Sequence, residues 1–281
     1  MGKKKTTFSG ALYYVVNTLF MVNVLGILLS VIVNSFGESW PNGAWFPDQF
    51  SLKWWEYCAT HHDLKQLLIM TMLITVVTVV LSLLLAYPAA FIMAKRDFYG
   101  KKAIHALFLL PVIIPPICYG LPLATVLYKT GLATTTLGVI IANMIPTISY
   151  MILVILPFIE QISDNVESAS RMLGANKLQY FTKVLIPLTI PGIMSAIMLS
   201  LVRVISMFEL TFLVCGAKNN TLVVALFADV NNPGYRPIQM IDALAVIFFI
   251  ITVVLFIISM RFDTSTSIYS QIGAKAKAEG K

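Results

Sequence analysis

The chain alternates long apolar runs with short polar segments. Six runs carry almost no charged residues, and they cover residues 11–36, 67–94, 103–128, 135–159, 188–213 and 240–260. Each run is longer than the roughly 20 residues that a helix needs to cross the apolar core of a bilayer. The pattern predicts an all-α membrane protein with six transmembrane helices.

The composition agrees with this pattern. Of 281 residues, 58% are hydrophobic and only 12% are charged, and the mean hydropathy is +0.83. Soluble domains carry about 25% charged residues. The first run is too long for a secretory signal and lacks a small-residue cleavage site, so we expect it to stay in the membrane as a span.

The net charge of +7 could suggest binding to a polyanion, but the positions of the basic residues argue otherwise. Five loop residues, Lys53, Lys65, Lys129, Lys218 and Arg236, fall on one side of a six-span topology. Fourteen of the twenty fall on the other: Lys3, Lys4, Lys5, Lys95, Arg96, Lys101, Lys102, Arg171, Lys177, Lys183, Arg261, Lys275, Lys277 and Lys281. The positive-inside rule therefore predicts that both termini are cytoplasmic, and nucleic acid is not an expected partner.

These features predict a division into an N-terminal segment, a first span, an external loop, a core of five spans and a tail. Their expected ranges are 1–10, 11–36, 37–66, 67–262 and 263–281, with a polar cytoplasmic interruption of the core at 160–187.

The external loop contains all four tryptophans, at positions 40, 45, 54 and 55. Because indole rings favour the membrane–water interface, the segment is predicted to be an interfacial loop that seals the outer rim. The alternative is a landing surface for an extracytoplasmic partner, since aromatic residues anchor protein interfaces. His61, His62 and Asp63 are not expected to bind metal, because adjacent helical residues point about 100° apart.

Three cysteines, Cys58, Cys118 and Cys215, form no disulfide framework and are interpreted as packing residues. Only Cys58 lies clearly in an outer loop, which leaves open a disulfide with a neighbouring chain.

The third run contains four prolines, at positions 111, 115, 116 and 122. Each removes a backbone donor, and lipid tolerates such breaks only where protein or a water-lined cavity satisfies the freed carbonyls. We expect this span to line a solute route or to pack inside the bundle.

The interruption at 160–187 predicts two short amphipathic helices on the cytoplasmic side. Asp164 has the spacing of an N-cap with Glu167 as its capping-box partner, and Gly174 follows the last helical residue. Asn176 is the expected cap of the second helix, which prolines 187 and 191 direct into the fifth span. The face mixes charge with apolar side chains and is predicted to dock into a partner: Met172, Leu173, Leu178, Tyr180 and Phe181.

This segment resembles the EAA motif of the permease subunits of bacterial ATP-binding-cassette (ABC) importers. Gly174 is followed by nine residues and then by the sequence Val-Leu-Ile-Pro ending at Pro187, as in that motif. The front departs from it: Ser168 stands at the usual glutamate position, Ala169 and Ser170 at the alanines, and the acid comes one place early as Glu167. The resemblance covers roughly residues 60 to 262 and implies the type I importer (MetI-like) permease fold.

The resemblance further implies that the segment is a coupling helix inserted into an ATPase subunit. Its coupling residues would be Glu167, Ser168, Ala169, Ser170, Arg171, Leu173 and Gly174. The sequence contains no G-x-x-x-x-G-K phosphate-binding loop, so this chain is expected to bind no cofactor, and ATP and Mg²⁺ belong to the partner. The expected assembly is two ATPase subunits, a second permease (a heterodimer rather than a homodimer) and an external binding protein, in the bacterial inner membrane.

Two charged residues, Arg203 and Glu209, lie within the fifth run. Charge inside a membrane marks a candidate functional site. Six residues apart on one helix, the two cannot pair with each other. Arg203 is the preferred residue for cargo specificity. Glu209 is a second candidate for the substrate path, and the alternative for Glu209 is a structural or gating role. Ser206 and Leu210 share the stripe of Arg203, and Asn143, Ser149 and Tyr150 of the fourth span are expected to face the same cavity.

The segment after the fifth run, residues 221–248, resembles the outer loop and sixth span of permeases for polyamines, opines, iron and aminoethylphosphonate. The predicted function is translocation of a small charged solute, with no enzymatic activity in this chain. An ion-gradient-driven secondary transporter is the alternative, although neither clustered midplane acids nor an inverted repeat supports it. A membrane-embedded enzyme is a third class, and no catalytic residue set on any span favours it.

Overall fold

The computed structural model describes residues 8–41, 46–61, 63–231 and 237–279. Side chains are described for the same ranges except 8–11, 61, 259 and 261–279. Several sequence expectations lie outside the described residues: the basic N-terminus, Trp45, the histidine pair at 61 and 62, Arg236, and the side chains of the basic tail.

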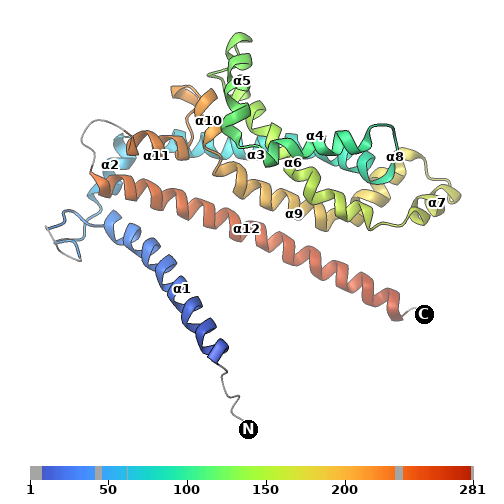
Figure 1. The fold of residues 1–281 in the computed structure, drawn as a ribbon, viewed down its shortest axis with the longest axis horizontal. Helices are drawn as coiled ribbons and strands as arrows, with labels where there is room; N and C mark the ends of the chain where they lie inside the picture. Colours follow the sequence, from blue (N-terminus) through green and yellow to red (C-terminus); the bar gives the residue numbers. More distant parts are fainter. Residues whose placement is uncertain (1–7, 42–45, 62, 232–236, 280–281) are drawn as a thin grey trace, which may run out of the picture. The chain divides into compact units, whose positions relative to one another are not determined.

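The described residues are helical and contain no strand, apart from a single antiparallel bridge between Gly37 and Phe50. The helices, labelled in Figure 1, are α1 (Phe8–Ser35), α2 (Lys53–His61), α3 (Leu64–Lys95), α4 (Lys101–Ile113), α5 (Pro116–Lys129), α6 (Thr136–Glu160), α7 (Asp164–Met172), α8 (Lys177–Tyr180), η1 (Phe181–Leu185), α9 (Ile186–Ile205), α10 (Glu209–Val214), η2 (Ala217–Asn219), α11 (Leu222–Val230) and α12 (Ile238–Glu279).

Length and hydropathy identify the membrane-crossing helices among the described residues. Five helical stretches are long and apolar enough to span a bilayer: Leu12–Ser35, Leu64–Lys95, Thr136–Glu160, Lys177–Ile205 and Ile238–Ile258. The α4–α5 pair supplies a sixth if it counts as one bent span. The all-α expectation is confirmed. The sixth predicted run continues as helix beyond 260, through the predicted tail.

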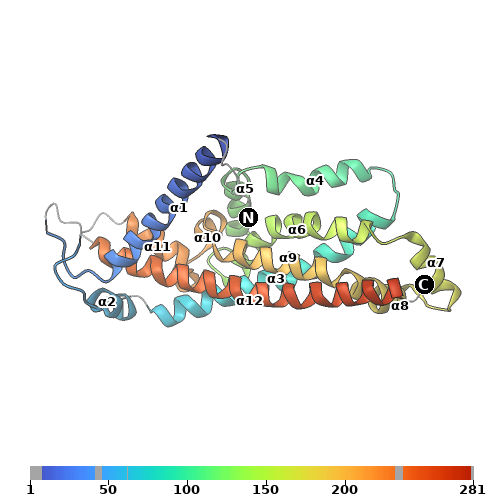
Figure 2. The ribbon, with the colours of Figure 1, turned by 90° about the horizontal axis from the view of Figure 1, so that it is seen from below.

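The chain divides into two compact units. One contains Met1–Leu64 and Leu226–Ile250, and the other contains Lys65–Ala225 and Ile251–Lys281. The second unit holds the long spans α3, α6 and α9, which Figure 2 shows side by side.

Helices α6 and α9 form the centre of the second unit. At Gly192 a Cβ atom would lie 2.4 Å from Cγ of Phe158, so the absent side chain lets α9 approach α6 closely. Around this contact lies a core of fully buried side chains from α3, α6 and α9, including Ala86, Met151, Ile155 and Ala196. Small residues at such crossings are the usual means by which membrane helices pack.

The third predicted span is not one straight helix. Helices α4 and α5 meet at an angle of 99°, and the break falls at the Pro115–Pro116 pair, where Ile114 has an extended backbone. Pro111 and Pro122 lie within their helices without ending them. Two consecutive residues without backbone N–H groups remove adjacent helical hydrogen bonds, which explains why the pair breaks the helix and the single prolines do not.

The fifth predicted span is also divided, which the sequence analysis did not foresee. Helix α9 ends at Ile205, and α10 begins at Glu209 after a non-helical link over 206–208. The assumption that Arg203 and Glu209 share one helix is therefore wrong. Helix α10 packs on α5 and α6, and Leu210 approaches Gly120 so closely that a Cβ there would meet its Cδ2 at 2.8 Å.

In the first unit, the tryptophan-rich segment is held together by its own indoles. Trp54 donates its Nε1 hydrogen to the Glu38 carbonyl at 3.3 Å, and Trp55 donates to the Ser35 carbonyl at 3.1 Å. The ring of Trp55 stacks on Phe36 with 5.1 Å between centroids. These two indoles organise the loop itself, and the landing surface for a partner stays a prediction.

The cysteines differ in environment. Cys58 is fully buried and its thiol donates to the Met240 carbonyl at 3.3 Å, which rules out the disulfide with a neighbouring chain. Cys118 is exposed, so its interpretation as a packing residue is wrong, while Cys215 is half-buried. Burial and the negative charge of Asp229 raise the pKa of the Cys58 thiol to about 11.

The α6–α9 contact predicts that Gly192→Ala destabilises the protein. The added methyl group would meet the rigid base of the Phe158 ring, and such overpacking costs about 1–3 kcal/mol. Gly26→Ala in α1 is the matched control, because no atom lies within 4 Å of its added Cβ. Thermal unfolding in detergent should show a lower midpoint for the first variant alone, and equal midpoints would contradict this packing.

The environment of Cys58 predicts resistance to alkylation. The thiolate is the reactive form, and a pKa of about 11 in place of 9.0 lowers its fraction near neutral pH by about 100-fold. Maleimide labelling at pH 7 followed by mass spectrometry should modify Cys58 only after denaturation. Because the pKa is raised, labelling of the folded protein should increase as the pH approaches 11, and rapid labelling at pH 7 would show that the thiol is accessible.

Candidate coupling segment and membrane site

The polar interruption begins with helix α7. The residue that caps it is Ser163, whose side chain accepts from the Asn165 N–H at 3.3 Å, so the assignment of Asp164 as the N-cap is wrong by one position. At the other end, Gly174 has a φ of +83°. The N–H groups of Gly174 and Ala175 donate to the carbonyls of Arg171 and Ser170, at 2.9 and 3.0 Å. This is a Schellman ending, and it confirms the glycine as the stop of the helix.

The second helix begins as expected and then continues into the membrane. Asn176 caps this helix and forms a capping box with Gln179. The Asn176 N–H donates to the Gln179 side chain and the Gln179 N–H donates to the Asn176 side chain, both at 2.8 Å. A capping box had been expected for the first helix instead, at Asp164 and Glu167. The backbone then stays helical from α8 through the π-helical η1 into α9. Pro187 does not interrupt this helix, because the wider π turn before it relieves the clash that its ring would cause.

Two ion pairs fasten α7 to the end of α3. The Lys95 ammonium contacts the Asp164 carboxylate at 2.8 Å and also donates to the Ile162 carbonyl. The Arg96 guanidinium contacts Glu167 at 3.1 Å, and Arg171 contacts the same carboxylate at 2.5 Å. The hydrogen bond and charge of Lys95 lower the pKa of Asp164 below its ordinary value. The carboxylate thus remains charged throughout the neutral range.

These contacts determine which coupling residues face outward. Glu167 has only 14% of its side chain exposed and is occupied by two arginines, and Ser170 is buried with its hydroxyl on the Glu167 carbonyl. Ser168, Ala169 and Arg171 are exposed, and Met172 and Leu173 are 83% and 89% exposed. The protruding surface is therefore an apolar tip rather than the acid that leads the segment.

In the membrane, Arg203 and Tyr150 lie together. The guanidinium carbon of Arg203 is 4.7 Å from the centre of the Tyr150 ring, a cation–π contact between α9 and α6. Within the part of the chain that the structure describes, neither Arg203 nor Glu209 forms an ion pair. Ser206 is exposed at the break and donates to the Val202 carbonyl at 3.2 Å.

The other residues expected around this cavity belong to the protein interior. Asn143 is 1% exposed and its amide donates to the Thr211 hydroxyl at 2.9 Å, which joins α6 to α10. Leu210 is fully buried, and Ser149 is 4% exposed and donates to the Ile145 carbonyl. Burial places these three side chains in the packing between helices, and the expectation that Asn143 and Ser149 face a cavity stays a prediction. This bond gives the Asn143 side-chain N–H a partner that lipid could not offer, while the Oδ1 of the same amide has no partner among the described residues.

Asp242 is a third charged residue inside a predicted span, and its hydrogen-bond partner Asn34 lies in the same unit, the first. The Asn34 amide of α1 donates to the Asp242 carboxylate of α12. No signal in the sequence links these residues, which lie 208 positions apart. The residues that fasten α7 were missed for the same reason, because Lys95 and Arg96 had entered the sequence analysis only as topology markers.

The helices and the coupling geometry point to one class of membrane protein, and comparison with known families identifies it. A family profile described as "Binding-protein-dependent transport system inner membrane component" matches residues 86–265. The chain belongs to this family. It is a permease subunit of an ABC importer, a multi-pass protein of the inner membrane, and the resemblance found in its EAA-like segment is confirmed. The ion-gradient-driven alternative is thereby overturned.

The permease is similar to proteins that move different solutes. It is 24% identical over 54% of its length to the molybdenum transport system permease protein ModB of Haemophilus influenzae, and the match covers 74% of that protein. It is 31% identical over 50% of its length to the spermidine/putrescine permease PotB of the same organism, covering 56% of it. The matches thus span between half and three quarters of these two relatives.

The fold of the permease is similar to that of a solved transporter chain. A bacterial ABC transporter involved in the import of the acidic polysaccharide alginate aligns over 92% of this chain and 99% of its own, with a TM-score of 0.71 and 18% identity. This likeness concerns the fold, and the MetI-like importer fold expected from the sequence is confirmed.

Proposed function

We propose that this permease forms one half of the pathway for a small solute with an anionic group, and that α7 and the α7–α8 turn transmit the movement of a partner ATPase to that pathway. The observation that carries the proposal is the break in the fifth span. It separates Arg203 from Glu209 and leaves Ser206 exposed between them. Interrupted helices and unpaired charge within a span are typical of the solute sites of transporters.

The chemistry of Arg203 favours an anionic partner. Its guanidinium is held in place by the Tyr150 ring at 4.7 Å, which orients the cation without neutralising it. A planar guanidinium binds carboxylate or phosphonate oxygens in a bidentate manner. Among the solute classes that the sequence suggested, opine-like amino acids and phosphonates fit this group better than simple polyamines, whose positive charge it would repel.

The coupling role rests on the protruding tip. Met172 and Leu173 are almost fully exposed, although a solvated loop has no reason to carry two large apolar side chains at its end. The ion pairs of Asp164 and Glu167 with Lys95 and Arg96 join α7 to the end of α3. A push on the tip would therefore move a transmembrane helix.

The proposed assembly combines this permease with subunits that supply the functions it lacks. Two ATPase subunits supply ATP and Mg²⁺ sites, a second permease completes the pathway, and an external binding protein delivers the solute. Arg203 and Glu209 form no ion pair within the described chain, so the second permease could supply their partners, and we infer a heterodimer rather than a homodimer.

Substitution of Arg203 tests the solute site. The complex, reconstituted in liposomes with its binding protein, should lose at least tenfold of its ATP-driven uptake in Arg203→Gln, because the charge is removed. Tyr150→Leu should lose about tenfold, since a desolvated cation–π contact contributes about 1–2 kcal/mol, while Tyr150→Phe should retain uptake. The solute is first chosen by thermal-shift screening of the binding protein. Normal uptake of that solute by Arg203→Gln would show that Arg203 lies outside the pathway.

Substitution of Gly174 tests the coupling role separately. Proline cannot adopt a φ of +83° and lacks the N–H that bonds to Arg171, so Gly174→Pro should insert normally but lose uptake and the ATPase stimulation caused by the binding protein. Gly174→Asn is the matched control, because asparagine tolerates the left-handed conformation. Undiminished uptake by the proline variant would count against the coupling assignment.

A further inference from the structure

A pocket lies beside the coupling segment, on the side that faces α3. Its volume is about 440 Å³. One wall consists of Pro88, Phe91 and Ile92 of α3 together with Phe181 of η1. Phe181 contacts Phe91 edge to face, with 5.5 Å between centroids, so this wall is both apolar and rigid.

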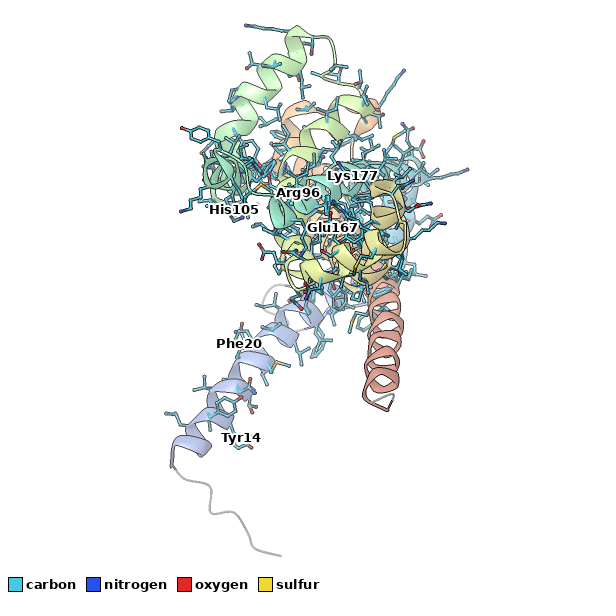
Figure 3. The ribbon with its side chains drawn as sticks, turned by 90° about the vertical axis from the view of Figure 1, so that its right-hand side faces the viewer. Tyr14, Phe20, Arg96, His105, Glu167 and Lys177 are labelled. Atoms are coloured by element: carbon cyan, nitrogen blue, oxygen red, sulfur yellow. The ribbon has the colours of Figure 1, made fainter. Side chains whose placement is uncertain are left out.

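Cationic groups surround the mouth of the pocket. Arg96, Arg171 and Lys177 line it with the single acid Glu167, and Figure 3 shows Arg96, Glu167 and Lys177 gathered at one end of this unit. The two arginines each use one nitrogen on Glu167, which leaves most of their donors available. Lys177 forms no ion pair among the described residues. The rim therefore carries an excess of two positive charges.

One of the residues that line the pocket carries an unsatisfied donor. Tyr180 is 97% buried, since only 3% of its surface is exposed, and its hydroxyl has no hydrogen-bond partner. A buried hydroxyl without a partner costs free energy, so a polar group of a ligand is expected to satisfy it.

The apolar wall continues into the membrane. Leu84, Pro88 and Ile92 are spaced four residues apart and therefore share one face of α3. Leu84 is 64% exposed and Ile92 is 48% exposed, in a helix that is long and apolar enough to span the bilayer. An exposed stripe thus leads from the bilayer to the pocket and ends at the basic rim, on the side that the positive-inside rule assigns to the cytoplasm.

We propose that this pocket binds an anionic phospholipid of the cytoplasmic leaflet. The phosphate lies between Lys177, Arg96 and Arg171 and accepts a hydrogen bond from Tyr180, while one acyl chain follows Ile92, Pro88 and Leu84. Basic pockets at the cytoplasmic ends of transmembrane helices suit such headgroups. A free phosphate would leave the apolar wall uncovered, and the exposed tip at Met172 and Leu173, which lies outside the lining, remains available to the ATPase.

The test measures lipid binding to the delipidated full chain by native mass spectrometry. Phosphatidylglycerol should bind at one site with an affinity at least tenfold above that of phosphatidylcholine. Lys177→Gln should weaken phosphatidylglycerol binding about fivefold, as expected for one basic residue near a headgroup, and Tyr180→Phe should also weaken it. Neither change should disturb folding, because among the described residues the ammonium has no ion pair and the hydroxyl no hydrogen bond. Lys183→Gln, which removes an equal charge from η1 outside the pocket, is the matched control and should bind like the unaltered chain.

Four outcomes would overturn the proposal. These are equal affinity for the two lipids, equal effects of Lys177→Gln and Lys183→Gln, and displacement of phosphatidylglycerol by the same concentration of inorganic phosphate, which would identify a site for free anions. The fourth is complete loss of the lipid when the ATPase subunits bind, which would assign the pocket to that protein partner. None of these measurements requires transport, so they stand apart from the proposed solute path.

Discussion

The need to satisfy backbone hydrogen bonds in lipid governs this structure. A transmembrane helix can satisfy them alone, whereas a break exposes donors and acceptors and must be covered by protein. The permease has two breaks in its second unit, at Pro115–Pro116 and at residues 206–208, and the half-helices that follow them pack on each other. Gly120 of α5 meets Leu210 of α10 at this contact, and the Thr134 N–H donates to the Val214 carbonyl at 2.8 Å. Each interruption is thus covered partly by the other.

The break between α9 and α10 also explains why charged residues occur on either side of it. Arg203 lies in the last turn of α9, where the negative end of the helix dipole favours a cation, and Glu209 lies in the first turn of α10, where the positive end favours an acid. A continuous helix would have offered neither position. The two charges can therefore reside inside a span without pairing with each other, which leaves both available to a solute or to a second subunit.

Apolar runs and capping residues predicted most of the helices, but not where the spans break. The Pro115–Pro116 pair is a local signal, and it marked the third span as distorted. The stretch between Arg203 and Glu209 contains neither proline nor glycine, so its break arises from tertiary packing and no local pattern could reveal it. In the coupling segment, Gly174 and Asn176 were predictable because a positive φ and a capping box depend on neighbouring residues. The ion pairs were not, because Lys95 and Arg96 meet their partners 69 and 71 positions away.

These ion pairs also explain the unusual front of the EAA-like segment. With the acid one position early, the helical rotation of about 100° turns Glu167 toward Arg96 and leaves the small Ser168 facing outward. The acid then fastens the segment to α3 rather than remaining on the outer face. Under the proposed coupling role, a segment joined to α3 by these ion pairs would pass a displacement on to that helix, and the tip at Met172 and Leu173 would need only apolar contact to receive it. With the acid at Glu167, the charged interaction lies between α7 and the end of α3, and the exposed tip is left to apolar side chains.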